Sequence, residues 1–113
     1  MNGGDPMLIR FREPRLERMR SGNLRLLLTE AGTWESFEAF AEKWTHQIGA
    51  LIVDRLDGPD VRVWRVSYEN RLVNLVYDDF PNGVSVEAID ADSNPAIEKL
   101  FSLVLSEAEP NGV

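Results

Sequence analysis

The side chains in this sequence that could do chemistry are mainly carboxylates at predicted turns. Five of them border predicted strands: Asp57, Asp60, Asp78, Asp79 and Asp90. Carboxylates that converge in one pocket can serve as a general acid and a general base. The simpler interpretation is that these carboxylates are dispersed over loops as solvated surface groups. A small enzyme with a carboxylate site at these loops is the alternative.

The same loops raise the question of a metal site. A divalent cation needs several carboxylate oxygens around one point. The candidate ligands are Asp78, Asp79, Glu87, Asp90 and Asp92. The segment that starts at Asp90 begins like a calcium loop, but Pro95 and Phe101 replace the glycine and the glutamate that such a loop requires. We interpret the segment as helix capping, and the sequence predicts no metal site.

Nucleophilic catalysis has little support in the sequence. The only histidine, His46, lies on a predicted helix away from its apolar stripe, where an exposed side chain is the simpler interpretation. A dyad of His46 with Ser67 or Ser85 stays open as the catalytic alternative. The sequence contains no G-x-S-x-G motif, no glycine-rich phosphate loop and no dinucleotide fingerprint, so it predicts no catalytic residue and no cofactor.

Length and composition limit the class of protein. The chain of 113 residues is the size of one domain, and it contains no cysteine, which excludes thiolate catalysis, cysteine zinc sites and disulfides. No apolar run reaches the ~18 residues that cross a bilayer, and the N-terminus lacks the apolar region of a secretory signal. We therefore expect a cytoplasmic protein.

The charge indicates which partners to expect. The formal net charge is -7, although residues 1–23 carry five arginines against three acids. An acidic body repels nucleic acid and anionic membranes, so we expect neither as a partner. It would suit a basic protein partner, but the same charge commonly serves solubility alone.

Two helices are predicted. Thr33 is the expected N-cap and Gly49 the expected end of a helix over residues 34–48. Its apolar stripe consists of Trp34, Phe37, Phe40, Ala41, Trp44 and Ile48. A second amphipathic helix covers residues 95–106, with Asn94 as its N-cap.

Alternating apolar residues predict strands at 24–29 and 50–56, followed by three more strands within 60–89. Glu69-Asn70 is the predicted two-residue turn between the first two of these three. The order β-α-β-β-β-β-α predicts an α+β two-layer sandwich, a five-stranded and mainly antiparallel sheet with two helices on one face. We expect a flexible or loosely docked segment at 1–23, a single domain at 24–107 and a frayed tail at 108–113.

One face of the predicted sheet has no helix to cover it. The residues that we expect on this outer face of the two central strands are Val63, Arg65, Leu72, Asn74 and Val76. The outer face of an antiparallel sheet is ordinarily polar, so apolar side chains there are unusual. They predict a protein-interaction face, either for a homodimer or for another protein.

The apolar and aromatic pattern resembles a small bacterial family known only as a domain of unknown function. The residues that carry the resemblance are Trp34-Glu35-x-Phe37 with Ala41, Asp60 then Trp64, and Tyr68-Glu69 followed by Leu72, Leu75 and Tyr77. The resemblance spans residues 34–105 and implies the fold and a bacterial origin, but no activity and no catalytic residues.

The chain is also similar, to a lesser degree, to type III secretion chaperones. The likeness lies in small size, low pI and the order of a helix, strands and a helix, and it implies a cytoplasmic dimer. Those chaperones open with a helix, whereas residues 24–29 predict a strand before the first helix here.

The sequence thus predicts a non-catalytic cytoplasmic binding or adaptor protein that acts through the outer sheet face or an edge strand. An edge strand offers main-chain donors and acceptors to an extended partner. The alternatives are a chaperone-like or immunity-type protein that binds a basic partner, which requires a continuous acidic patch, and the small carboxylate enzyme.

Overall fold

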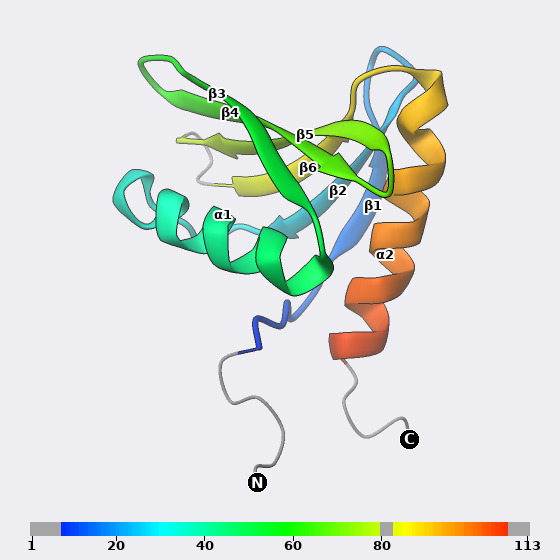
Figure 1. Ribbon diagram of the computed structural model, residues 1–113, viewed down its shortest axis with the longest axis horizontal. Coiled ribbons are helices and arrows are strands. Elements are labelled where there is room, and N and C mark those ends of the chain that lie inside the picture. The colour runs from blue at the N-terminus through cyan, green and yellow to red at the C-terminus, as the bar shows by residue number, and fades with distance from the viewer. Residues whose placement is uncertain (1–7, 80–82, 109–113) are drawn as a thin grey trace, which may run out of the picture.

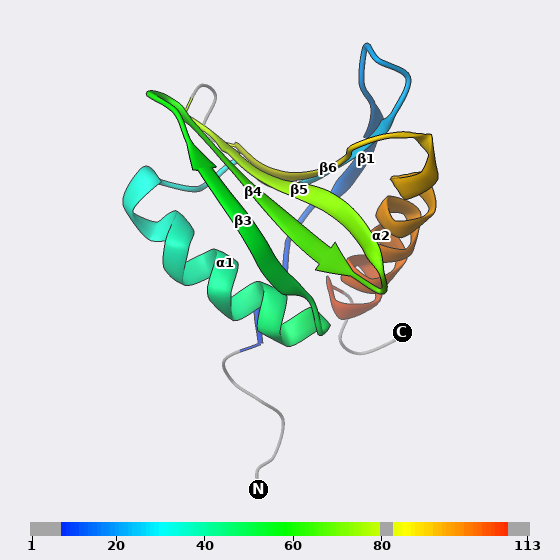
Figure 2. The same cartoon turned by 45° about the horizontal axis from the view of Figure 1, so that its top comes forward.

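The computed structural model describes residues 8–79 and 83–108, which form one sheet and two long helices. The strands are β1 (Arg15–Arg18), β2 (Leu24–Thr29), β3 (Leu51–Asp57), β4 (Val61–Tyr68), β5 (Arg71–Asp78) and β6 (Gly83–Ala88). The helices are α1 (Trp34–Ile48) and α2 (Asn94–Ala108), and a short 3-10 helix, η1 (Ala91–Ser93), precedes α2 (Figure 1). Both long helices lie on the same side of a curved sheet (Figure 2), which confirms the α+β class.

The six strands are ordered β1-β2-β6-β5-β4-β3, and every neighbouring pair is antiparallel. Since β6 lies between β2 and β5, the chain has to cross the sheet between β2 and β3. The helix α1 makes that crossing. This order leaves β1 and β3 as the two edge strands.

The prediction of five strands is wrong by one, because β1 adds a sixth. This strand lies within the segment 1–23 that we expect to be flexible or loosely docked, and it pairs with β2 from Arg15 with Leu27 to Arg18 with Leu24. Its sequence, RLER, has no apolar alternation, so the pairing with β2 and not the local pattern makes it a strand. Of the tail predicted at 108–113, Ala108 is the last residue of α2, and residues 109–113 lie outside the described residues.

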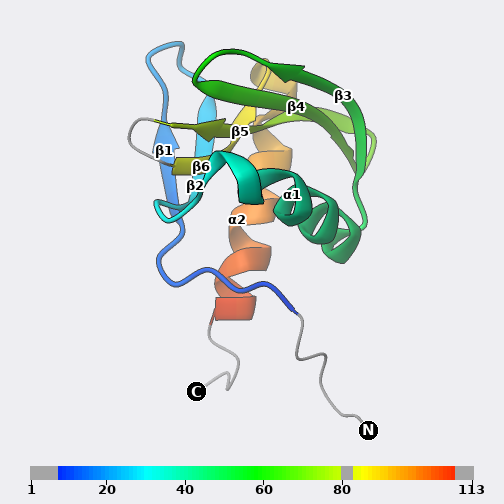
Figure 3. The ribbon, with the colours of Figure 1, turned by 90° about the vertical axis from the view of Figure 1, so that its left-hand side faces the viewer.

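The segment before β1 is also attached to the domain. The side chain of Gln47 on α1 accepts a hydrogen bond from the backbone N–H of Ile9 at 2.8 Å and donates one to its carbonyl at 2.9 Å. Phe11 is buried and meets the ring of Trp44 edge-on at 5.7 Å between centroids. Figure 3 shows this segment passing below α1 and close to the C-terminal half of α2.

The core lies between the inner face of the sheet and the helices. Trp64, Leu75, Val86 and Leu26 form one buried row across β4, β5, β6 and β2. The buried apolar side chains of the helices are Phe37, Ala41 and Trp44 from α1 and Ala96, Ile97, Leu100 and Val104 from α2. Burial of this apolar surface is the main favourable contribution to folding.

The ends of α1 confirm the predicted caps. The hydroxyl of Thr33 accepts a hydrogen bond from the N–H of Ser36 at 3.1 Å, and Gly49 has a φ of 76° at the C-terminal end. The N-cap predicted for α2 is wrong. Asn94 has helical backbone angles, and its Oδ1 accepts a hydrogen bond from the N–H of Leu24 at 2.8 Å, so this side chain attaches α2 to β2.

Candidate functional site

Cross-strand pairing arranges the side chains of the outer sheet face in rows. The polar row contains Asp54, Arg65, Asn74, Glu87, Arg25 and Glu17, from β3 across to β1. The row beside it contains Leu56, Val63, Val76, Ser85, Leu27 and Arg15. A third, shorter row joins Leu51, Ser67 and Leu72 at the other end of β3, β4 and β5.

The five residues expected on the outer face lie there, but their exposure differs. Arg65 and Leu72 are exposed, and Leu72 keeps 45% of its surface accessible. Val63 and Asn74 are half-buried, and Val76 is buried at 7% exposure between the neighbouring strands. The accessible part of this set is therefore its Arg65 and Leu72 end.

Sequence reasoning missed the most exposed apolar side chains of this face, which come from β3. Leu51 and Leu56 are each 70% exposed, and both point to the outer face in the same rows as Leu72 and Val63. These residues could not be found from the sequence, because the chain order does not reveal that β6 inserts beside β2 and leaves β3 at the edge of the sheet.

A groove adjoins Leu72 at this end of the sheet. It has a volume of about 310 Å³ and lies between the β4–β5 turn and the start of η1. Its lining consists of Arg65, Asn70, Arg71, Leu72, Ile89, Asp90, Asp92 and Ser93. The groove therefore offers apolar surface next to charges of both signs.

The polar row contains one carboxylate in an unusual environment. Burial raises the pKa of Glu87, the positive charge of Arg25 opposes that rise, and the negative charge of Asp78 adds to it. Arg25 itself donates to Glu17 at 2.6 Å, and the Oδ1 of Asn74, the cross-strand neighbour of Glu87, is buried without a hydrogen-bond partner among the described residues. The carboxylate of Glu87 is thus partly desolvated, and the positive charge of Arg25 offsets this cost only in part.

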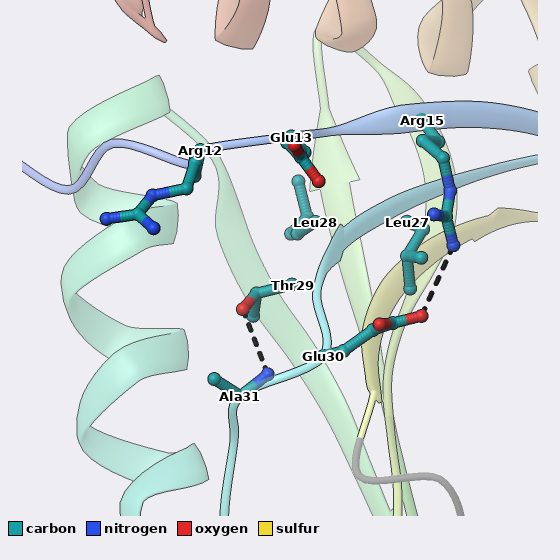
Figure 4. Close-up of a pocket in the computed structure, with 8 residues that line it drawn as sticks. All are labelled: Arg12, Glu13, Arg15, Leu27, Leu28, Thr29, Glu30 and Ala31. Atoms are coloured by element: carbon teal, nitrogen blue, oxygen red, sulfur yellow. Dashed lines mark hydrogen bonds and ion pairs between the residues drawn. The ribbon is translucent and has the colours of Figure 1, made fainter.

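A second pocket, of about 270 Å³, lies between the N-terminal segment and the end of β2 (Figure 4). Arg15 donates to Glu30 at 3.2 Å, and the hydroxyl of Thr29 accepts from the N–H of Ala31 at 3.0 Å. Arg12 also lines the pocket. These contacts fix the turn after β2, and the lining side chains provide no paired acids and no nucleophile with a base.

Four of the carboxylates proposed for an enzyme site, Asp57, Asp60, Asp78 and Asp79, come to the same end of the sheet, whereas Asp90 lies at the other end. Asp57 binds the guanidinium of Arg62, and this hydrogen bonding lowers its pKa against the opposing effect of burial. Asp79 accepts from the hydroxyl of Tyr77 at 2.8 Å near the start of β6, whereas Asp90 caps η1 beyond the other end of that strand. Across residues 8–79 and 83–108, the acids and the histidine form no group that could hold a metal ion.

The alternative dyad is not formed either. His46 is exposed on α1, in the helix layer. Ser67 and Ser85 belong to the outer face, where they pair with Leu72 and Val76. The sheet therefore separates the histidine from both hydroxyls.

The fold defines an α+β protein with one sheet face packed on helices and the other not covered by a helix. Residues 15–105 match the family model described as Protein of unknown function (DUF3630), so the chain belongs to this family. The match confirms the resemblance to a family of unknown function. Comparisons with curated proteins and with solved structures found no match. Neither of the long helices described here has the length and apolar character to span a membrane.

Proposed function

We propose that this protein is a bacterial, cytoplasmic and non-catalytic binding or adaptor protein. Its proposed contact surface for a protein partner is the outer sheet face at the end formed by β3, β4 and β5. The observation that carries the proposal is the exposure of Leu51 at 70% and Leu72 at 45%, which lie in one cross-strand row there. Large apolar side chains gathered on one face of a sheet are typical of an interaction site.

The surroundings of Leu72 support a partner of mixed character. The adjoining groove of about 310 Å³ combines two apolar side chains, Leu72 and Ile89, with charges of both signs, among them Arg71 and Asp92. Protein interfaces commonly have an apolar centre and a polar rim. We therefore propose a partner that places an apolar side chain on Leu72 and paired charges around it.

The charges of the face bear on the alternative of a strongly basic partner. Arg25 and Arg65 alternate with Glu87 and Asp54 along the polar row. A protein that covers a basic surface needs a continuous acidic patch. The alternation therefore supports a partner of mixed charge over an immunity-type or chaperone-like one.

The test is comparative affinity capture from a lysate of the source organism. Wild type, Leu72→Lys and Leu105→Lys serve as baits, because Leu105 is a comparably exposed leucine (40%) on α2, in the helix layer. We expect wild type and Leu105→Lys to capture the same partner protein in equal amounts. The amount captured by Leu72→Lys should be lower by about tenfold or more. Equal retention by all three baits would contradict the proposed surface.

A further inference from the structure

The edge strand β3 is the most exposed element of the sheet. Six of its seven residues are exposed, and only Ile52 is half-buried. The register with β4 shifts between Ile52 and Asp54, which marks a bulge at Val53. A bulge disturbs pairing locally, so the regular part of the free edge runs from Asp54 to the end of the strand.

The hydrogen bonds of the hairpin show which backbone groups face the free edge. The N–H of Gly58 donates to the carbonyl of Val61 at 2.8 Å, so the pair nearest the turn is hydrogen-bonded. Bonded and non-bonded pairs alternate along an antiparallel ladder, which leaves the N–H and C=O groups of Arg55 and Asp57 pointing away from β4. In agreement with this, the N–H of Arg55 donates to the side chain of Asp54 at 2.9 Å.

We propose that this edge pairs with the same edge of a second copy of the chain. The two β3 strands run antiparallel, and the twofold axis that relates the copies passes between their two Leu56 residues. Three registers place the outward backbone groups at the centre of such a pair. Two of them set Arg55 against Arg55 or Asp57 against Asp57, and like charges directly opposite each other are unfavourable. The third sets Arg55 of each copy against Asp57 of the other, so opposite charges face each other. Within its own chain the guanidinium of Arg55 also lies 3.4 Å from the carboxylate of Glu42 and Asp57 binds Arg62, so the register is favoured by the absence of like-charge pairs.

In this register Leu56 faces Leu56 of the second copy. It is a non-hydrogen-bonded pair, in which Cα atoms lie about 4.5 Å apart and side chains are in contact. Both leucines are 70% exposed in the single chain, and the pairing buries them against each other on the outer face. The twofold axis keeps the two outer faces on the same side of one continuous sheet.

Two features make the pairing weak. Edges this short bury less than the roughly 1,200–2,000 Å² of a stable interface, so we expect a weak and reversible dimer. The carboxylate of Asp54 also has to release the N–H of Arg55 before a second strand can accept it. Asp54 thus limits pairing, as charged side chains on edge strands do.

A single introduced cysteine tests the register, because the natural chain has no thiol. Leu56→Cys should form a disulfide-linked dimer under mild oxidation, since facing Cα atoms about 4.5 Å apart are within disulfide range. Leu51→Cys is the matched control, equally exposed at 70% on the same strand. In the proposed register its two copies lie about 33 Å apart, at ~3.3 Å per residue, and should stay unlinked. Equal linkage of both variants, or of neither, would overturn the proposal.

Sedimentation of the proteins without introduced cysteines, over a micromolar to millimolar series, tests the same pairing without a crosslink. Leu56→Lys should weaken the dimer about tenfold, because two lysines then face each other, and Asp54→Ala should strengthen it several-fold by freeing the N–H of Arg55. Leu72→Lys should leave it unchanged, which separates this dimer from the proposed partner surface. If wild type and Asp54→Ala both remain monomers over the whole concentration series, the edge does not pair with itself. An extended segment of another protein would then be the remaining candidate to pair with it.

Discussion

Arg62 donates two hydrogen bonds to the carboxylate of Asp57, from Nε at 3.0 Å and from Nη2 at 3.1 Å. Its Nη1 donates to the carbonyl of Trp34 at 2.9 Å, and the guanidinium lies 4.8 Å from the ring of Trp34 and 5.3 Å from that of Trp64. The buried charge of Arg62 therefore joins the end of β3 to β4 and to the first turn of α1.

Loss of Asp57 should destabilise the fold. Asp57→Ala leaves the guanidinium of Arg62, 9% exposed, with a single carbonyl acceptor, and removes the acceptor of the Trp64 indole N–H at 3.0 Å. Because the carboxylate is partly solvated, we expect a loss of about 2 kcal/mol in the free energy of unfolding, below the figure for a fully buried pair. Urea denaturation measures it, and Asp60→Ala, which removes an exposed carboxylate of the same turn, should change stability by less than about 0.5 kcal/mol.

The same pair should give the protein a defined acid sensitivity. Since Arg62 lowers the pKa of Asp57 in the folded state, the stabilisation is fully present above the unfolded pKa of about 3.9 and is lost as pH falls through the lowered value. The difference in unfolding free energy between wild type and Asp57→Asn should be constant at neutral pH and shrink below about pH 4. A difference that grows in acid would contradict this assignment.

Glu87 should behave in the opposite way. Burial raises its folded pKa, so its charge costs stability above that value, and the cost disappears as pH falls below the unfolded pKa of about 4.3. Glu87→Gln removes the charge and brings an amide donor beside the unpartnered Oδ1 of Asn74. We expect a gain of up to about 1 kcal/mol in unfolding free energy at pH 7 and none at pH 4. A loss at pH 7 would show that the pairing of Glu87 with Arg25 outweighs its desolvation.

Gln47 should hold the N-terminal segment on the domain. Gln47→Ala removes both hydrogen bonds to the backbone of Ile9, at 2.8 and 2.9 Å, and leaves those backbone groups half-buried. We expect a loss of about 1–2 kcal/mol in stability and faster proteolysis before β1. His46→Ala, at the exposed neighbouring position, is the control, and equal cleavage of the two variants would argue against this role.

The local parts of the fold could be predicted because local chemistry determines them. Thr33, Gly49 and the apolar stripe between them define α1, and Glu69 and Asn70, with φ values of 50° and 66°, form the predicted tight turn. The strand β1 could not be predicted, because RLER becomes a strand only through its pairing with β2.

The surface was predictable only in part, for a related reason. The alternation within β4 and β5 places Arg65 and Leu72 on the outer face, but burial of Val76 depends on neighbouring strands. Exposure of Leu51 and Leu56 follows from the position of β3 at the sheet edge, which is a property of the strand order.

The most direct test of the proposed surface is photo-crosslinking inside the source organism, with a photoreactive residue at position 72 or, as the control, at position 105. These positions replace exposed leucines of the sheet face and the helix layer, at 45% and 40% exposure. We predict a crosslinked product with a different protein from position 72 and none from position 105. A product from position 105 alone, or from neither position, would contradict the assignment of the outer sheet face as the partner surface.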